Sequence, residues 1–328
     1  MAAPSAPARA VAAVVYNPIK VDLPRLKASV RTAEQHAGWD TSLWFATTKE
    51  DSGEAATKLA RAQGADLVLA AGGDGTVRGV AQGLRDSGIP LALLPSGTGN
   101  LLARNLGLVL NDLDSSIKNA FTGGERTIDL GVVQLVRSGG DSEEHVFVVM
   151  AGLGIDAKMI ALTNSKLKKA VGWLAYVDAS VRAIPSLEPV RLTYQLDGGS
   201  QRSLSVHTVI IGNCGSLPGG ILLMPDAKPD DGILDVAALR PRGAFGWLKV
   251  WNKVLWENGV LRRSAVGRRI IDLNRDVRDV TYVTCRDLML TVEKPQAFQL
   301  DGDEFGEVIS VHTHVDTGGL TVKVPAER

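Results

Sequence analysis

Residues 66–84 read DLVLAAGGDGTVRGVAQGL, an apolar run that ends in glycines around an aspartate and continues with a helical pattern. Glycine permits positive φ and lets backbone N–H groups approach an anion closely. The positive dipole end of the helix that follows favours the same anion. Gly72, Gly73 and Gly75 therefore predict a phosphate-binding turn between a buried strand and a helix.

A second strand, turn and helix follows in PLALLPSGTGNLLARNLG, residues 90–107. The carboxyl ends of adjacent parallel strands face one crevice in open α/β sheets, so two such turns would share a ligand. A tight turn without a ligand is the alternative for either stretch alone, whereas the pair favours a phosphate site. Neither turn completes GxxxxGK[ST] or GxGxxG, which disfavours a P-loop NTPase and a dinucleotide-binding dehydrogenase.

The aspartate in the first turn has an electrostatic consequence. A carboxylate at Asp74 would repel nucleotide phosphates unless a cation lies between them. Mg²⁺ is a hard cation that carboxylate and phosphate oxygens can bind together. We therefore expect Mg²⁺ beside Asp74.

The alternation of strand and helix extends over the first third of the chain. Apolar runs at 11–16, 42–47, 66–71 and 90–94 are separated by helical patterns at 23–37, 52–63, 76–85 and 100–106. Continuous apolar strands between helices are typical of a parallel sheet that is covered on both faces. After Gly124 the strand-like runs are closely spaced, with 288–293 and 297–300 among them. This spacing predicts an antiparallel sheet or sandwich with helical insertions at about 158–184 and 243–260.

With 328 residues the chain exceeds the size at which one hydrophobic core usually stops growing, so we expect two domains. The predicted fold class is α/β plus β, with an N-terminal doubly wound α/β nucleotide-binding domain at 11–128 and a C-terminal antiparallel β-sandwich domain at 129–306. Residues 1–10 are predicted to form a disordered tail. The segment 307–328 carries two further alternating runs that could return to the first domain.

Composition and charge exclude several functional classes. Hydrophobic residues make up 45% of the chain, and 36 Lys and Arg balance 36 Asp and Glu. Zero net charge gives no general attraction to nucleic acid, so no nucleic-acid partner is expected. Cys214 and Cys285 form no CxxC pair, which argues against a zinc cluster or disulfide framework and favours a cytoplasmic setting. No apolar run is long enough to span a membrane.

Together the two glycine turns resemble the diacylglycerol kinase catalytic domain family, which includes bacterial lipid kinases and sphingosine kinases. The stretches that carry this resemblance are Asn17-Pro18, GGDGT (72–76), PSGTGN (95–100), AGLGIDA (151–157), MPDAKPDDGILDV (224–236) and QLDGDEFG (299–306). GGDGT alone is not specific for this family, because NAD kinases share it. The ordered set of all these stretches is specific.

The resemblance implies an enzyme that uses ATP and Mg²⁺ to phosphorylate a lipid in a cleft between the two domains. Two positions depart from the family pattern: Arg78 stands where Asn is frequent, and Leu101 stands where Asp is frequent. An arginine beside phosphates is electrostatically favourable, and the leucine leaves open whether one polar contact is lost. The implied ATP contacts are Thr47, Gly72, Gly73, Asp74, Gly75, Thr76, Arg78, Gly79, Gly97, Thr98 and Asn100.

An acidic turn, KPDDGI at 228–233, precedes a predicted strand in the second half of the chain. It reads either as a surface β-turn or as a loop that binds a hard cation. The resemblance implies a structural Mg²⁺ here, held by the Asp231 side chain and by the carbonyls of Lys228 and Ile233.

A second acidic turn, DGDE at 301–304, follows another predicted strand. Asp-Gly is by itself an ordinary hairpin turn. Phosphoryl transfer to an alcohol, however, needs a carboxylate that accepts the hydroxyl proton. The family pattern DGE places this base at Asp303, and the adjacent Glu304 is the alternative.

Segment 240–278 has the composition of a membrane-binding surface. It carries ten Lys or Arg against three Asp or Glu, and its helical part places Trp247 and Trp251 on one apolar stripe. Such a helix fits interfacial attachment to an anionic membrane, while packing against the β-sandwich is the alternative. The helical stretch 164–184 is a second candidate of the same kind.

The sequence therefore predicts an ATP-dependent lipid kinase, with diacylglycerol as the leading substrate and phosphatidic acid as its product. Two alternatives stay open: an NAD kinase-like enzyme, and a nucleotide-binding or lipid-binding module with impaired catalysis. The expected location is cytoplasmic and peripherally membrane-associated, with the lipid substrate and the membrane surface as partners. A homodimer is compatible with the sequence, which does not fix the oligomeric state.

Overall fold

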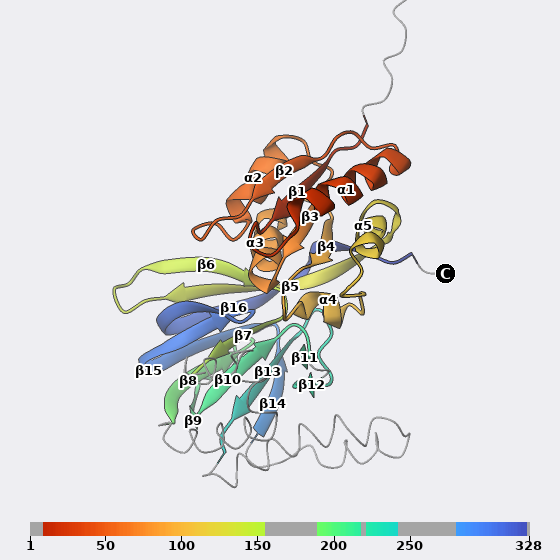
Figure 1. Cartoon of the computed structure of the whole chain (residues 1–328). Helices are drawn as coiled ribbons and strands as arrows, with labels where there is room; N and C mark the ends of the chain where they lie inside the picture. The colour runs from red at the N-terminus through yellow and green to blue at the C-terminus, as the bar shows by residue number, and fades with distance from the viewer. Residues whose placement is uncertain (1–8, 155–188, 218–220, 242–279, 327–328) are drawn as a thin grey trace, which may run out of the picture. The chain divides into compact units, whose positions relative to one another are not determined.

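The computed structural model describes residues 9–154, 189–217, 221–241 and 280–326, and the chain divides into two compact units (Figure 1). Unit 1 comprises Met1–Leu130 and Thr317–Arg328, and unit 2 comprises Gly131–Asp316. Two long strands, β5 (Gly124–Val136) and β16 (Asp303–Val324), belong partly to each unit. The boundaries between the units therefore fall inside strands.

Unit 1 is built on a parallel sheet with the strand order β2-β1-β3-β4. β16 extends this sheet beyond β4 through the parallel pair of Val322 and Leu91. The strands are β1 (Ala12–Tyr16), β2 (Leu43–Ala46), β3 (Leu67–Gly72) and β4 (Leu91–Pro95). The helices are α1 (Leu23–Ala37), α2 (Glu54–Ala62), α3 (Asp74–Leu84), α4 (Leu101–Asn105) and α5 (Leu113–Thr122).

Helices cover both faces of the parallel sheet, with α1 and α5 on one face and α2 and α3 on the other (Figure 1). Val14 and Leu69 of the strands pack with Val30 of α1 and Ile117 of α5. β3 is buried at every position, which explains why its sequence is a continuous apolar run. The predicted doubly wound α/β fold is confirmed.

Capping residues determine where the helices of unit 1 begin and end. The side chain of Asp22 accepts a hydrogen bond from a first-turn amide of α1 at 3.1 Å, and Gly38, with φ of 72°, ends the helix. These bounds agree with the predicted helix at 23–37. Helix α5 was not predicted from the sequence, although Asp112 caps it in the same way at 3.0 Å.

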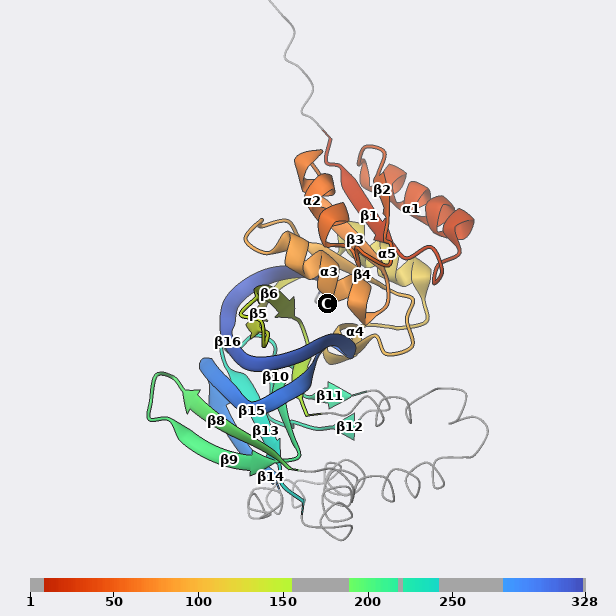
Figure 2. The same ribbon diagram turned by 90° about the vertical axis from the view of Figure 1, so that its left-hand side faces the viewer.

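Unit 2 is an antiparallel β structure, as predicted. Its main path of paired strands is β14-β13-β10-β7-β15-β16, with β8 and β9 attached to β15, and β6 to β5. Figure 2 shows the hairpin of β8 and β9 beside β15. The strands are β6 (Ser142–Phe147), β7 (Met150–Leu153), β8 (Val190–Leu196), β9 (Arg202–Val206), β10 (Thr208–Gly212), β11 (Ser216–Leu217), β12 (Ile221–Leu222), β13 (Leu234–Leu239), β14 (Val280–Cys285) and β15 (Asp287–Leu300).

Two apolar clusters lie on opposite faces of the path from β13 to β15. Successive side chains of a strand point to opposite faces, so the neighbours Ile210 and Ile211 belong to different clusters. Phe298 and Leu300 of β15 pack in the cluster of Ile211. The other cluster, called the Ile210 cluster below, consists of Ile210, Met224, Ala237, Leu239 and Val280.

Candidate functional site

The two glycine turns lie side by side in unit 1. The backbone N–H of Ser96 donates to the carbonyl of Gly72 at 3.0 Å. A Cβ atom on Gly97 would lie only 2.7 Å from the Cα of Gly73, closer than real Cβ atoms approach. Glycine at position 97 therefore lets the two turns meet, and the structure brings them to one site.

The first turn leads into α3, whose N-terminus can receive an anion. Gly73 is the N-cap in extended backbone, and no side chain among the described residues caps the helix. The first N–H groups of a helix lack intrahelical partners and carry the positive end of its dipole. Asp74, half-buried Gly75 and Thr76 form this first turn, so their amides suit a phosphate group.

The carboxylate of Asp74 joins the two turns. It accepts hydrogen bonds from the backbone N–H of Asn100 at 3.0 Å and of Leu101 at 2.5 Å. Burial raises the pKa of Asp74 above its usual value, against the opposing effects of these amides and of the Lys20 charge. Leu101 contributes through its backbone, so its departure from the family pattern does not remove this contact.

Lys20 stands at the same turn, although the sequence did not single it out. Its Nζ lies 2.6 Å from the position that a Cβ on Gly73 would take, so the ammonium group is beside the α3 N-terminus. Asn17 holds the loop of Lys20, because its N–H donates to Ala71 at 2.9 Å and its side chain accepts from Ile19 at 3.0 Å. The only sign of Lys20 in the sequence is its position shortly after Asn17. The neighbouring residues do not show which strand end the lysine approaches.

Three further expected ATP contacts surround these turns. Thr47 directly follows β2, is buried, and donates its N–H to the carbonyl of Tyr16 at 2.9 Å. Asn100 has a φ of 49°, and its side chain closes the second turn through hydrogen bonds of 3.0 and 2.9 Å with Gly97. Thr98, in the same turn, is exposed.

Packing inside unit 1 accounts for other residues with an expected ATP contact. The buried side chain of Thr76 fills the space beside Gly72. A Cβ on Gly79 would lie 2.6 Å from the Oγ of Ser52, so this glycine lets α3 pack against the start of α2. Arg78, on the same helix, is buried. Thr76 and Gly79 are thus explained without a nucleotide.

The acidic loop 228–233 lies in unit 2, directly before β13. The Asp231 carboxylate accepts a hydrogen bond from the N–H of Ile233 at 3.2 Å. In the described parts of the chain, no three Asp, Glu, His or Cys side chains are placed to hold a metal ion. A Mg²⁺ ion in this loop would therefore depend on backbone carbonyls beside Asp231, and those of Lys228 and Ile233 are oxygen ligands of the right kind.

Unit 2 is expected to lose stability as the pH rises through about 6 in the absence of divalent cations. Burial, together with the charges of Asp231 and Asp226, raises the pKa of Asp235 to about 6. An acid with a raised folded-state pKa stabilises the fold at low pH, and this contribution is lost as the pH rises through that pKa. Between about pH 4 and pH 7 in EDTA, a range that spans the ordinary pKa of 3.8 and the raised pKa of about 6, the melting temperature should fall more for the wild type than for Asp235→Asn. Parallel pH profiles would contradict this prediction.

The hairpin between β15 and β16 carries the two candidate bases. Its turn residues, Asp301-Gly302, both have positive φ, 49° and 89°, which is the pattern of a type I′ turn. Leu300 pairs with Asp303, and Gln299 pairs with Glu304. Because adjacent strand residues point to opposite faces, the side chains of Asp303 and Glu304 leave the strand in opposite directions.

Asp301 has a structural role that its place in a hairpin turn does not reveal. Its carboxylate accepts hydrogen bonds from the backbone N–H of Val148, Val149 and Met150 at 2.8 to 3.0 Å. The residue is 3% exposed. Val148 and Val149 connect β6 to β7, and Met150 is the first residue of β7, so Asp301 fixes this part of the chain to the hairpin.

Replacing Asp301 with alanine is expected to destabilise unit 2 by about 3–5 kcal/mol, because three N–H groups lose a charged acceptor. Chemical unfolding of the two proteins measures the difference. The exposed neighbour Asp303 provides the matched control, and Asp303→Ala should cost less than about 1 kcal/mol. An equal decrease in the free energy of unfolding of the two variants would show that the amide contacts of Asp301 do not stabilise unit 2.

The predicted site residues fall into separate parts of the structure. Asp74 belongs to unit 1, whereas Asp303 and Glu304 belong to unit 2, and the geometry above holds within each unit. The predicted helix at 158–184, the basic segment from 242 onward and residues 1–8 of the predicted tail lie outside the described residues. Within the described residues, none of the helices has the length and apolar character needed to cross a bilayer.

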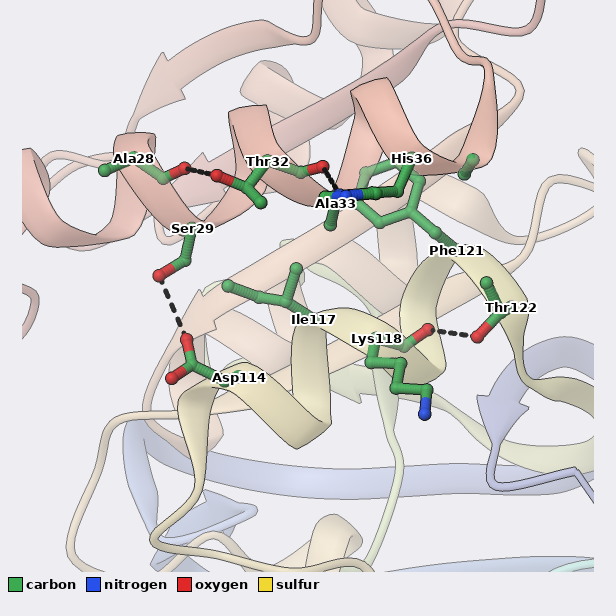
Figure 3. Close-up of a pocket in the computed structure, with 11 residues that line it drawn as sticks. Ala28, Ser29, Thr32, Ala33, His36, Asp114, Ile117, Lys118, Phe121 and Thr122 are labelled. Carbon is green, nitrogen blue, oxygen red and sulfur yellow. Dashed lines mark hydrogen bonds between the residues drawn. The ribbon is translucent and has the colours of Figure 1, made fainter.

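A groove of about 610 Å³ lies elsewhere in unit 1, between α1 and α5 (Figure 3). Ile117 and Phe121 give it apolar walls, and Ser29 donates a hydrogen bond to Asp114 at 3.0 Å at its side. None of the predicted site residues in the described chain lines this groove. The glycine turns, where amides and charges converge, are therefore the better candidate site.

Comparison with known proteins gives matches over both parts of the chain. The model of the diacylglycerol kinase catalytic domain matches residues 12–133, and that of the YegS C-terminal NAD kinase beta sandwich-like domain matches residues 148–268. A diacylglycerol kinase of Bacillus subtilis (strain 168) is 28% identical over 313 residues, covering 93% of this chain and 94% of that protein. A diacylglycerol kinase of Staphylococcus saprophyticus is 31% identical over 227 residues, covering 67% and 70%.

Solved structures share the fold at low sequence identity. A diacylglycerol kinase from Bacillus anthracis str. Sterne superposes with a TM-score of 0.63 at 19% identity, covering 97% of both chains. Yeast NADH kinase complexed with NADH superposes with a TM-score of 0.52 at 9% identity, covering 98% of this chain and 84% of that chain. At these identities the likeness shows the fold alone, and kinases named for different substrates share it.

Proposed function

This chain belongs to the diacylglycerol kinase family and is a lipid kinase, and from that premise we propose that it transfers the γ-phosphoryl group of ATP to diacylglycerol, forming phosphatidic acid. The observation that carries this proposal is the pair of glycine turns joined through Asp74. Both turns lie inside the residues matched by the catalytic domain. The α3 N-terminus and Lys20 supply positive charge for a nucleotide phosphate.

In the proposed reaction the chain binds the triphosphate at the glycine turns. Backbone N–H groups in the first turn of α3 donate to phosphate oxygens, and the ammonium group of Lys20 stabilises the negative charge. Asp74 keeps the second turn against the first through the amides of Asn100 and Leu101. Asp74 is a carboxylate in this site that would suit Mg²⁺, which would supply positive charge to the phosphate groups.

The lipid hydroxyl has to lose its proton as the new bond to phosphorus forms. We assign this proton to a carboxylate of the hairpin between β15 and β16, Asp303 by the family pattern, with Glu304 as the alternative. The Asp231 loop would hold a second, structural Mg²⁺ together with the carbonyls of Lys228 and Ile233. That ion would stabilise the loop before β13 and take no part in the transfer.

Turnover of ATP with a panel of acceptors tests this function. The full chain is incubated with ATP and Mg²⁺ and with diacylglycerol, sphingosine, ceramide, phosphatidylglycerol or NAD, and the products are identified by mass spectrometry. We expect diacylglycerol to be the preferred acceptor. NAD belongs in the panel because an NADH kinase has the same fold, and phosphorylation of NAD alone would overturn the proposal. Absence of any turnover would favour the module with impaired catalysis.

We also propose peripheral attachment to anionic membranes through the basic segment 240–278. Each Lys or Arg near an anionic surface contributes on the order of 1 kcal/mol, and salt screens this contribution. Vesicle binding should therefore rise with anionic lipid content, fall with added salt, and weaken in the double variant Lys249→Glu and Lys253→Glu. Sedimentation with vesicles measures this binding. If the double variant binds as strongly as the wild type, internal packing of the segment is favoured.

A further inference from the structure

One buried amide of unit 2 lacks a hydrogen-bond partner. Gln299 in β15 is 7% exposed, and its Nε2 is fully buried without an acceptor among the described residues. A buried N–H group without a partner costs free energy, so folded proteins retain few of them. The amide of Gln299 is therefore a candidate contact for an oxygen atom of a ligand.

The pairing of the strands places Gln299 on the face that carries the Ile210 cluster. Gln299 lies opposite Gly152 of β7, and Gly152 lies opposite Ile210 of β10. Residues paired across strands share a face, so Gln299 and Ile210 point to the same side of the sheet. Because glycine has no side chain, no side chain at position 152 separates the amide from this buried apolar cluster.

The same amide is adjacent to the hairpin with the candidate bases. Glu304 lies directly opposite Gln299, at the Cβ separation of about 5 Å that is typical of paired residues. Asp303 is the next residue along β16, about 3.4 Å further along the strand. In diacylglycerol the free hydroxyl and the nearest ester group are separated by a few bonds. A lipid whose hydroxyl reaches Glu304, the carboxylate on the same face as Gln299, therefore brings an ester group close to this amide.

We propose that Gln299 is a specificity residue for the lipid: its Nε2 donates a hydrogen bond to an ester carbonyl of diacylglycerol. A carbonyl oxygen accepts hydrogen bonds and donates none, so it complements this donor, and apolar surroundings strengthen the hydrogen bond. The inference rests on the proposed function and deepens it, because it names the part of the acceptor lipid that the chain recognises.

Kinetics with matched ester and ether lipids test the inference. Dioctanoylglycerol and dioctylglycerol carry the same free hydroxyl and chains of similar length, but only the ester has carbonyl groups. The wild type should show a kcat/KM about 10-fold higher for the ester, since a site built around a hydrogen bond discriminates against an analogue that lacks it. Gln299→Met keeps the length of the side chain and lacks the donor, so it should abolish this preference through the KM of the ester and leave the KM of ATP unchanged.

A matched control lies on the same strand. Gln296 is half-buried, and its side chain donates to the carbonyl of Lys294 at 3.3 Å, so Gln296→Met should retain the ester preference. Equal kcat/KM for both lipids in the wild type overturns the inference and leaves the kinase activity standing, whether or not the variant folds. Retention of the preference by Gln299→Met, or an equal loss on both lipids, also overturns it. If the wild type phosphorylates neither lipid, the proposed function fails, and the inference fails with it.

Discussion

Replacing Asp74 with asparagine is expected to lower kcat/KM for phosphoryl transfer by about 10²-fold or more. The carboxylate accepts hydrogen bonds from two consecutive amides, those of Asn100 and Leu101. An asparagine side chain has one acceptor oxygen, and its NH₂ group would face the second N–H donor. The glycine turns would then lose a group that holds them together, and Mg²⁺ at this position would lose a charged ligand.

Initial rates with diacylglycerol and melting temperatures, measured on the same preparations, check this expectation. Asp114→Asn is the matched control, because Asp114 also accepts a hydrogen bond in unit 1 but lies in the groove between α1 and α5. The control should retain nearly full activity. A folded Asp74→Asn protein with nearly normal turnover would show that the joined turns do not carry the reaction.

Asp303→Asn is expected to lower kcat by about 10²–10⁴-fold, the usual range for the loss of a general base, with the KM of ATP nearly unchanged. Glu304→Gln is expected to lower kcat less. Both changes conserve the size of the side chain and remove its ability to accept a proton. Since the two side chains leave β16 on opposite faces, one cannot replace the other at a single substrate position.

Rates of the two amide variants at saturating ATP and lipid decide between the carboxylates. If Glu304→Gln inactivates the protein while Asp303→Asn does not, the base is Glu304, which shares its face of the hairpin with Gln299. Small losses in both variants would contradict a base in this hairpin. Asp301 is unsuitable for this comparison, because its carboxylate already binds three backbone amides.

The two glycine turns and the helices beside them could be predicted because their signals are local. Gly72 ends an apolar strand and Gly73 directly follows it, and Asp22 and Gly38 mark both ends of α1 within its own sequence. For unit 2, the presence of antiparallel strands could be predicted, but the residues at which the strands begin and end were less predictable. β15 continues as one strand through a register shift between Thr291 and Gln296, where the sequence predicts two runs, 288–293 and 297–300.

Residues whose partners are distant in the sequence could not be predicted. Lys20 approaches Gly73 only because β1 and β3 are neighbours in the sheet. Asp301 binds amides at Val148–Met150, which become its neighbours only once the hairpin packs against them. The unpartnered amide of Gln299 is visible only after burial and hydrogen bonds are known. Each of these features depends on tertiary structure and leaves no periodic or motif signal.

The shared strand β16 has a consequence for folding during translation. β4 pairs with Val322 of β16, and Lys323 forms an ion pair with Glu125 at 2.8 Å, so unit 1 needs residues that the ribosome adds after all of unit 2. While unit 2 is being synthesised, β4 lacks β16 as its neighbour. An unpaired strand edge of this kind is a template for pairing with other chains. The synthesis of unit 1 thus begins first, but unit 1 cannot complete its fold until unit 2 has been synthesised. Until then the edge of β4 is a defined site for nascent-chain chaperones to protect.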